Sequence, residues 1–175
     1  MALKTLDGAD AAPRKGRGAG INPEGRFEHL ERGAVDDGWN TPPEEQRGLK
    51  THITIEQAKS IISHNDSPDV GFSQSINPYA GCEHGCSYCF ARPSHAYRNL
   101  SPGIDFETRI FAKTNAAELL RKELSKPSYK CSVIAIGVNT DAYQPIEREL
   151  KITRSILEVC AEFNQPVGLI TKNAT

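Results

Sequence analysis

Residues 77–90 of the chain read NPYAGCEHGCSYCF and contain three of its five cysteines, Cys82, Cys86 and Cys89. The spacing Cys-x3-Cys-x2-Cys places three thiols close together without an obvious fourth ligand. Gly81 and Gly85 permit the tight turns by which these thiols can converge. Closed zinc sites use four protein ligands, and thiolates select zinc or iron–sulfur clusters among the common metals. The stretch therefore predicts a metal centre with one open position.

The composition agrees with metal or redox chemistry in a reducing compartment. The 175 residues include 21 basic and 22 acidic side chains, and the net charge of −1 gives no strong field that would attract nucleic acid. An odd number of cysteines, three of them clustered, does not suit a disulfide framework. The chain begins without an apolar leader segment and has no run of the roughly 18 apolar residues that span a bilayer. We therefore expect a cytoplasmic protein that makes no membrane contact.

Apolar patterns on both sides of the cysteines predict alternating strands and helices. The run Val133–Ile136 is typical of a parallel strand that is buried on both faces. Strands that alternate with helices predict an α/β fold with a parallel sheet and right-handed crossovers. The expected elements are a short helix that opens at a capping box, Thr54–Gln57, a strand over 72–76, an extended segment over 106–113, a helix from the capping residue Asn115 to before Pro127, a strand over 131–138, a helix over 151–163 and a strand over 167–171.

The chain divides into two parts. Residues 1–50 are rich in glycine and poor in aliphatic side chains, and we expect a flexible, poorly ordered arm. Its basic run Arg14–Arg17 is expected to be solvated. Residues 51–175 form the predicted core, with the first three strand–helix units and an apparent truncation after the third strand.

The cysteine loop follows the first parallel strand, where α/β folds place their active sites. A structural zinc site is the alternative, with His84, Cys131 or Cys160 as fourth ligand. His84 would have to fold back onto the metal of its own loop. Cys160 belongs to an apolar helix face, and Cys131 begins its strand at the opposite end of the sheet. These positions favour an iron–sulfur centre over zinc.

The spacing of Cys82, Cys86 and Cys89, with Tyr88 before the third cysteine, resembles the signature of the radical S-adenosylmethionine superfamily. Residues 75–175 further resemble the branch that contains spore photoproduct lyase and its bacterial relatives. The stretches that carry this second resemblance are Asn77–Cys82, Tyr88–Arg92, Asp141–Glu147 and Ile170–Lys172, together with Arg17–Ala19, Asn22–Pro23 and Arg26–Glu28 in the arm.

This resemblance implies a partial (β/α)6 barrel, of which the chain is an N-terminal part. Cys82, Cys86 and Cys89 would hold three irons of a [4Fe–4S] cluster, and S-adenosylmethionine would chelate the fourth. Reductive cleavage of S-adenosylmethionine would give a 5′-deoxyadenosyl radical that abstracts hydrogen from a substrate. A flavodoxin or ferredoxin would supply the electron.

Five further residues are predicted to contact the cofactor. By the resemblance, Tyr88 would pack near the adenine. Asn139, Thr140 and Asp141 end the second parallel strand and could accept hydrogen bonds from the ammonium group of S-adenosylmethionine. Lys172, just past the third strand, could pair with its carboxylate. In the alternative interpretation, Thr140 and Asp141 turn the chain and Lys172 is solvated.

The substrate is not specified by these residues. Spore photoproduct lyase carries a hydrogen-donating cysteine near the end of its second strand, but no cysteine lies between Ser132 and Val159 here. The photoproduct reaction is therefore not expected in that form, although a nucleic-acid substrate fits the branch. A second function class is a zinc-stabilised module that binds nucleic acid through the basic arm. Glu147 and Arg148 fit a charged pair at a helix start.

Overall fold

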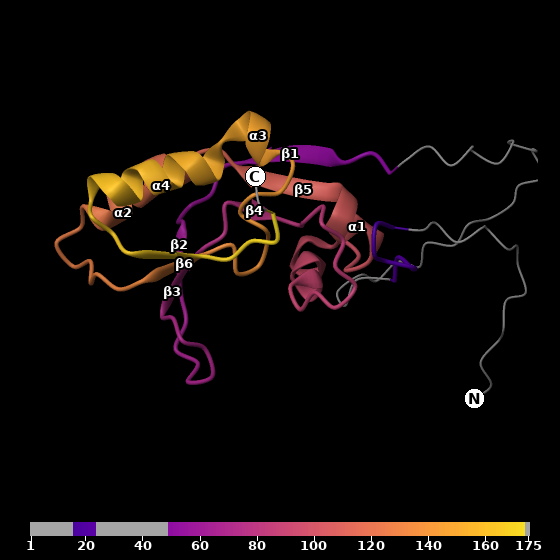
Figure 1. The fold of residues 1–175 in the computed structure, drawn as a ribbon, viewed down its shortest axis with the longest axis horizontal. Helices are drawn as coiled ribbons and strands as arrows, with labels where there is room; N and C mark the ends of the chain where they lie inside the picture. Colours follow the sequence, from indigo (N-terminus) through magenta and orange to yellow (C-terminus); the bar gives the residue numbers. More distant parts are fainter. Residues whose placement is uncertain (1–15, 24–48, 174–175) are drawn as a thin grey trace, which may run out of the picture.

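The computed structural model describes residues 16–23 and 49–173, which form a mixed α/β fold with two sheets (Figure 1). Most of the predicted arm, residues 1–15 and 24–48, lies outside the described residues. One sheet has the strand order β1-β5-β4 and the other has the order β2-β3-β6-β7. The strands are β1 His52–Glu56, β2 Ile62–His64, β3 Gln74–Ile76, β4 Tyr79–Ala80, β5 Arg109–Lys113, β6 Ile134–Ile136 and β7 Val167–Leu169.

The four-stranded sheet contains the predicted parallel strands. β3, β6 and β7 are parallel, with Ser75 opposite Ala135 and Ala135 opposite Gly168. All three residues of β6 are buried, as the continuous apolar run predicted. β2 adds an antiparallel edge strand that the sequence did not reveal. The α/β class is thus confirmed; the two sheets form no closed barrel within the described residues, and the radical S-adenosylmethionine barrel stays a prediction.

The helix expected to open at Thr54 is wrong, because the segment forms β1. Ile53, Thr54 and Ile55 are three β-branched residues in succession, and such residues favour an extended backbone. β1 pairs in parallel with β5, with Ile53 opposite Ile110. Ile53 packs against the core, whereas Ile55, nearer the end of the strand, is 54% exposed.

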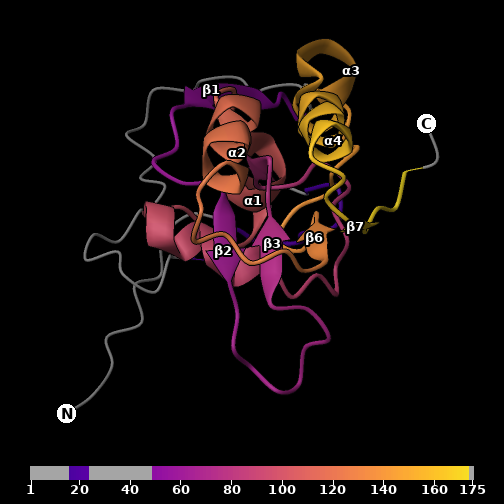
Figure 2. The same cartoon turned by 90° about the vertical axis from the view of Figure 1, so that its left-hand side faces the viewer.

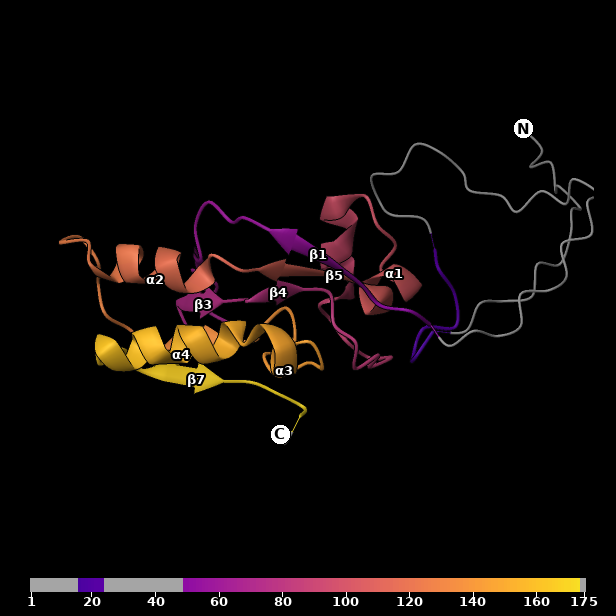
Figure 3. The ribbon, with the colours of Figure 1, turned by 90° about the horizontal axis from the view of Figure 1, so that it is seen from above.

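Two amphipathic helices cover the four-stranded sheet and bury its core. α2 (Ala116–Leu124) and α4 (Ile152–Glu162) pack against each other above the strands, as Figures 2 and 3 show. Both helices lie where the sequence predicted them. The innermost side chains of the core are completely buried: Ile76, Ile110, Leu120, Ile134, Ile136 and Ile156.

Asn115 precedes α2 but does not cap it with its side chain, contrary to the prediction. Its Oδ1 accepts a hydrogen bond from the Ala58 amide at 3.0 Å, and its Nδ2 donates to the Ala58 carbonyl at 2.9 Å. The side chain thereby ties the chain after β1 to the start of α2. The Asn115 side chain thus bonds to the backbone of Ala58 and not, as the capping pattern suggested, to the first turn of α2.

Three short helices follow the cysteine loop along the chain. A 3-10 helix, Arg92–Arg98, follows the loop, and α1 (Ile104–Thr108) leads into β5. The predicted extended segment over 106–113 is therefore wrong in its first part and right from Arg109. α3 (Glu147–Leu150) precedes α4.

In the described part of the chain, no helix is long and apolar enough to cross a membrane.

Candidate metal centre

The cysteine loop leaves the sheets through a glycine that is required by its backbone conformation. Gly81, between β4 and Cys82, has a φ of +83°. A Cβ at this position would lie 2.9 Å from the Arg109 carbonyl oxygen and 3.0 Å from Cε1 of the buried His95. The Cys82 amide then donates to the Phe106 carbonyl at 2.9 Å. Gly81 and the Cys82 amide therefore allow the start of the loop to pack closely against β5 and α1.

The three cysteines of the loop carry free thiols and differ in exposure. Cys82 is buried against Ala91, Phe106 and Cys89, whereas Cys86 and Cys89 are half-buried. Burial raises the pKa of the Cys82 thiol to about 11, although backbone N–H groups near its sulfur oppose this shift. The apolar side of the loop thus buries one thiol, and the other two stay partly exposed.

Thr140 and Gln144 hold the start of the loop from the carboxyl end of β6. Thr140 Oγ1 donates to the Gly81 carbonyl at 2.7 Å, and the Glu83 amide donates to Gln144 Oε1 at 3.3 Å. Gln144 Nε2 also donates to Thr140 Oγ1 at 3.3 Å. Thr140, predicted to meet the cofactor, therefore contacts the loop backbone, and Gln144 is a contact that the sequence analysis missed.

Asp141 joins three segments around the loop. Its Oδ1 accepts from the Thr171 hydroxyl at 2.7 Å, and its Oδ2 accepts from the Lys172 amide at 2.7 Å. Nε2 of His84, inside the cysteine loop, lies 3.5 Å from the same Oδ2. The structure thus brings the predicted ends of the second and third parallel strands together with the loop.

Lys172 and Tyr88 meet at the exposed side of the loop. The Lys172 ammonium donates to the Tyr88 hydroxyl and lies 4.3 Å from the centroid of its ring. The hydrogen bond to Tyr88 raises the pKa of Lys172, and the Cys86 thiol contributes in the same direction. Tyr88 itself is 76% exposed. These two predicted residues are therefore adjacent to each other and to Cys86.

Asn139 is less closely involved with the loop. Its side chain is exposed, and its amide donates to Asn77 Oδ1 at 2.7 Å. This bond ties the end of β6 to the turn after β3. The predicted contact between Asn139 and a cofactor stays a prediction.

The residues considered as a fourth zinc ligand lie elsewhere or face another partner. His84 approaches Asp141, Cys160 is buried in α4, and the exposed Cys131 lies 3.5 Å from Gln165 Oε1. In residues 16–23 and 49–173, no three His, Cys, Asp or Glu side chains are grouped so that they could hold a single metal ion. A cubane cluster is a different case, because each cysteine binds a separate iron.

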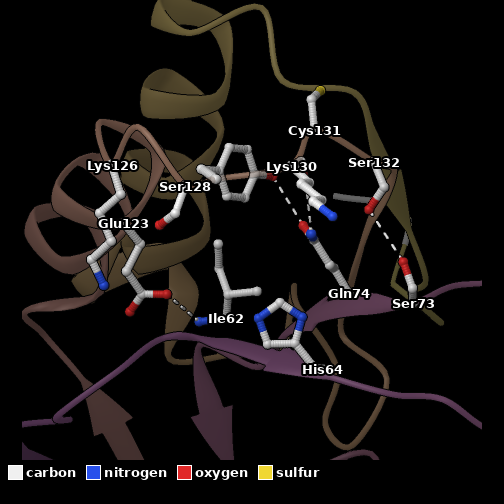
Figure 4. Close-up of a pocket in the computed structure, with 11 residues that line it drawn as sticks. Ile62, His64, Ser73, Gln74, Glu123, Lys126, Ser128, Lys130, Cys131 and Ser132 are labelled. Atoms are coloured by element: carbon white, nitrogen blue, oxygen red, sulfur yellow. Dashed lines mark hydrogen bonds between the residues drawn. The ribbon is translucent and has the colours of Figure 1, made fainter.

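A pocket of about 470 Å³ is lined by Cys131 and by none of the three loop cysteines; Figure 4 shows its lining. It opens at the amino ends of β3 and β6, whereas the cysteine loop lies past their carboxyl ends. At the wall of the pocket, the Glu123 carboxylate accepts hydrogen bonds from the Ile61 and Ile62 amides, and Gln74 Nε2 donates to the Lys130 carbonyl at 3.0 Å. These contacts join β2 and β3 to neighbouring segments, and the pocket is not part of the candidate metal centre.

Thiol labelling separates the two cysteines outside the loop. Burial raises the pKa of Cys160 from 9.0 to about 11, so its thiolate fraction near pH 8 falls about a hundredfold. We expect iodoacetamide to label the exposed Cys131 first and Cys160 only after unfolding, as measured by peptide mass spectrometry. Because the unfolded chain releases the Cys160 proton first, the free energy of unfolding should also fall between pH 9 and 11. Equal labelling of both thiols in the native protein would contradict this burial.

Comparison with known proteins finds relatives of undetermined activity. The chain is 37% identical to the uncharacterised proteins Rv2578c of Mycobacterium tuberculosis and Mb2609c of Mycobacterium bovis, over 79% of this chain and 44% of each relative. It is 33% identical to the uncharacterised protein MJ0683 of Methanocaldococcus jannaschii, over 63% of this chain and 39% of that protein. No protein-family model matches, and no solved structure matches. The chain spans less than half the length of these curated relatives.

Proposed function

We propose that this chain is the cluster-binding part of a radical S-adenosylmethionine enzyme. The observation that carries the proposal is the position of the three-cysteine loop, which lies past the carboxyl ends of the parallel strands β3, β6 and β7. Two polar side chains that follow the carboxyl end of β6, Thr140 and Asp141, contact residues of the loop, Gly81 and His84. Ligand sites of α/β folds lie at this edge.

The residues of the loop fit an iron–sulfur cluster by their chemistry. Cys82, Cys86 and Cys89 would hold the cluster, since thiolates are its usual ligands. Phe106 and Ala91 give the site one apolar wall. The chemistry that such a cluster supplies when bound is the one-electron reductive cleavage of S-adenosylmethionine, which yields the 5′-deoxyadenosyl radical that abstracts hydrogen from a substrate. The electron donor would be a flavodoxin or ferredoxin, and the substrate class stays open.

The chain's own residues would position S-adenosylmethionine beside the cluster. Lys172 and Tyr88 lie together at the open side of the loop, so an ammonium is available for the carboxylate and a ring for the adenine. Asp141 Oδ2 accepts a hydrogen bond from the Lys172 backbone amide at 2.7 Å and thereby fixes the segment that carries this ammonium. Thr140 donates to the Gly81 carbonyl and thereby holds the start of the loop, and its contact with the ammonium of the cofactor stays a prediction.

The test is anaerobic reconstitution followed by reduction with S-adenosylmethionine. We expect about four iron and four sulfide per chain and the release of 5′-deoxyadenosine, measured by liquid chromatography. Cys86→Ala should lose both the cluster absorption and the product. Cys131→Ala is the matched control, because Cys131 is exposed and lies beyond the opposite end of the sheet.

Two results would contradict the proposal. One tightly bound zinc per chain, without iron, would support the zinc-stabilised module instead. A protein that binds the cluster but releases no 5′-deoxyadenosine with several reductants would support the three cysteine ligands and contradict the cleavage reaction.

A further inference from the structure

A buried carboxylate beside the cysteine loop binds the N-terminal arm. Glu107 of α1 is 0% exposed, and its side chain accepts three successive backbone amides. The Arg17 amide donates at 2.5 Å, the Gly18 amide at 3.2 Å and the Ala19 amide at 2.8 Å. Successive N–H groups that converge on an anion form a nest, which is a recurrent mode of carboxylate binding.

The same carboxylate is connected to the cysteine loop through Arg92. An Arg92 guanidinium nitrogen lies 2.5 Å from Glu107 Oε1, and Arg92 Nε donates to the Cys86 carbonyl at 3.0 Å. Arg92 also donates to the carbonyls of Pro102 and Gly103. Charge-assisted bonds between buried groups are strong and directional. Glu107 therefore connects the arm on one side to the backbone of a predicted cluster ligand on the other.

The arm also lies directly against the loop. A Cβ built on Gly18 would be 1.6 Å from the Gly85 carbonyl oxygen and 3.3 Å from the Ser87 amide. No side chain fits in that space, and the obstacle is backbone. Asn22 continues the contact, because its Oδ1 accepts the Asp105 amide at 3.1 Å. Residues 18–22 thus lie against the backbone on both sides of Cys86 and are bonded to α1. Figure 1 shows this described part of the arm, in indigo, beside α1.

We propose that residues 16–23 are a clasp over the cysteine loop, and that Glu107 and Arg92 are positioning residues for Cys86. A fully buried carboxylate and a guanidinium side chain that is 12% exposed need each other and further hydrogen bonds to offset their lost hydration. The backbone amides of the clasp donate those hydrogen bonds to Glu107. Binding of the clasp to Glu107 and the placement of the cysteine loop are therefore coupled. The positioning role rests on the proposed function, whereas the clasp is a property of the metal-free protein.

The experiment compares Gly18→Ala with Gly20→Ala in the reduced, metal-free full chain. Gly20 is two residues away, and a Cβ there would have no neighbour within 4 Å. We expect Gly18→Ala to accelerate hydrogen exchange of the amides of residues 17–19 by about tenfold or more and to raise the alkylation rate of Cys86 severalfold. Gly20→Ala should leave both rates unchanged. Cys160, buried in α4, reports general unfolding.

A second variant tests the carboxylate itself. Glu107→Gln keeps the size of the side chain but loses its charge and one acceptor, so it should release residues 17–19 and expose Cys86 while Cys160 stays protected.

The proposal is overturned if amides 17–19 exchange equally fast in the parent chain and in Gly18→Ala, because the arm would then not be seated. It is also overturned if labelling of Cys86 and Cys160 rises in parallel in Gly18→Ala, since that result shows general loosening. These outcomes do not depend on cluster binding, so they are distinct from a failure of the proposed enzyme activity.

Discussion

Glu147→Ala should destabilise the protein by about 3 kcal/mol or more, because it removes the acceptor of three donors. Glu147 is 7% exposed, and it accepts the Thr153 and Arg154 amides at the start of α4, each at 3.0 Å. It also accepts the hydroxyl of Tyr79. Burial, and then the bond to Glu147, raise the pKa of Tyr79 well above its ordinary value, so the hydroxyl remains a donor. Denaturant unfolding followed by circular dichroism measures the loss.

Two further variants divide this effect. Glu147→Gln keeps one acceptor oxygen and should retain part of the stability, and Tyr79→Phe should cost about 1 kcal/mol. Glu149→Ala is the matched control, because Glu149 lies in the same short helix and is exposed. A Glu147→Ala protein as stable as Glu149→Ala would show that this carboxylate does not hold α4.

Gly81→Ala should lower the free energy of unfolding by about 2 kcal/mol and reduce cluster loading as well. An alanine at φ +83° is strained, and its Cβ would press on the Arg109 carbonyl oxygen and on Ile110 Cδ1, each at 2.9 Å. Relief of these contacts must move Cys82, the next residue. Iron per chain after reconstitution, together with the unfolding midpoint, measures both effects.

Gly71→Ala provides the comparison for this substitution. Gly71 is exposed, and a Cβ there would meet nothing within 4 Å. The protein should therefore keep its stability and its iron. Equal behaviour of the two alanine variants would contradict the close packing of Gly81 against β5 and His95.

Long-range apolar patterns predicted the central part of the fold well. The runs that became β6 and α4 are continuously apolar and amphipathic respectively, and burial of their apolar residues decides their structure. Local polar signals were less reliable. The capping boxes at Thr54 and Asn115 were overridden, the first by strand pairing with β5 and the second by hydrogen bonds to Ala58. Such partners lie more than 50 residues away and leave no local pattern.

The same distinction applies to the candidate site. Spacing alone identified Cys82, Cys86 and Cys89 as a group, and strand order predicted that Asp141 and Lys172 lie at the same edge of the sheet. The side chains that hold the loop were missed, because Gln144 and Glu107 bind backbone groups of distant segments and Arg92 binds a backbone carbonyl of the loop itself. A buried charge such as Glu107 is recognised only when its partners in the arm are known.

The bonds that hold the cysteine loop have a consequence for the order of events during synthesis. The loop is synthesised before the residues that hold it. Thr140, which binds the Gly81 carbonyl, follows Gly81 by 59 residues, and Lys172, whose amide binds Asp141, follows Asp141 by 31 residues. At about 5–20 residues per second, the ribosome needs several seconds to supply them. The nascent thiols are therefore without these contacts throughout that interval. Loading of the proposed iron–sulfur cluster onto a loop held by these contacts would have to wait until translation has passed β7.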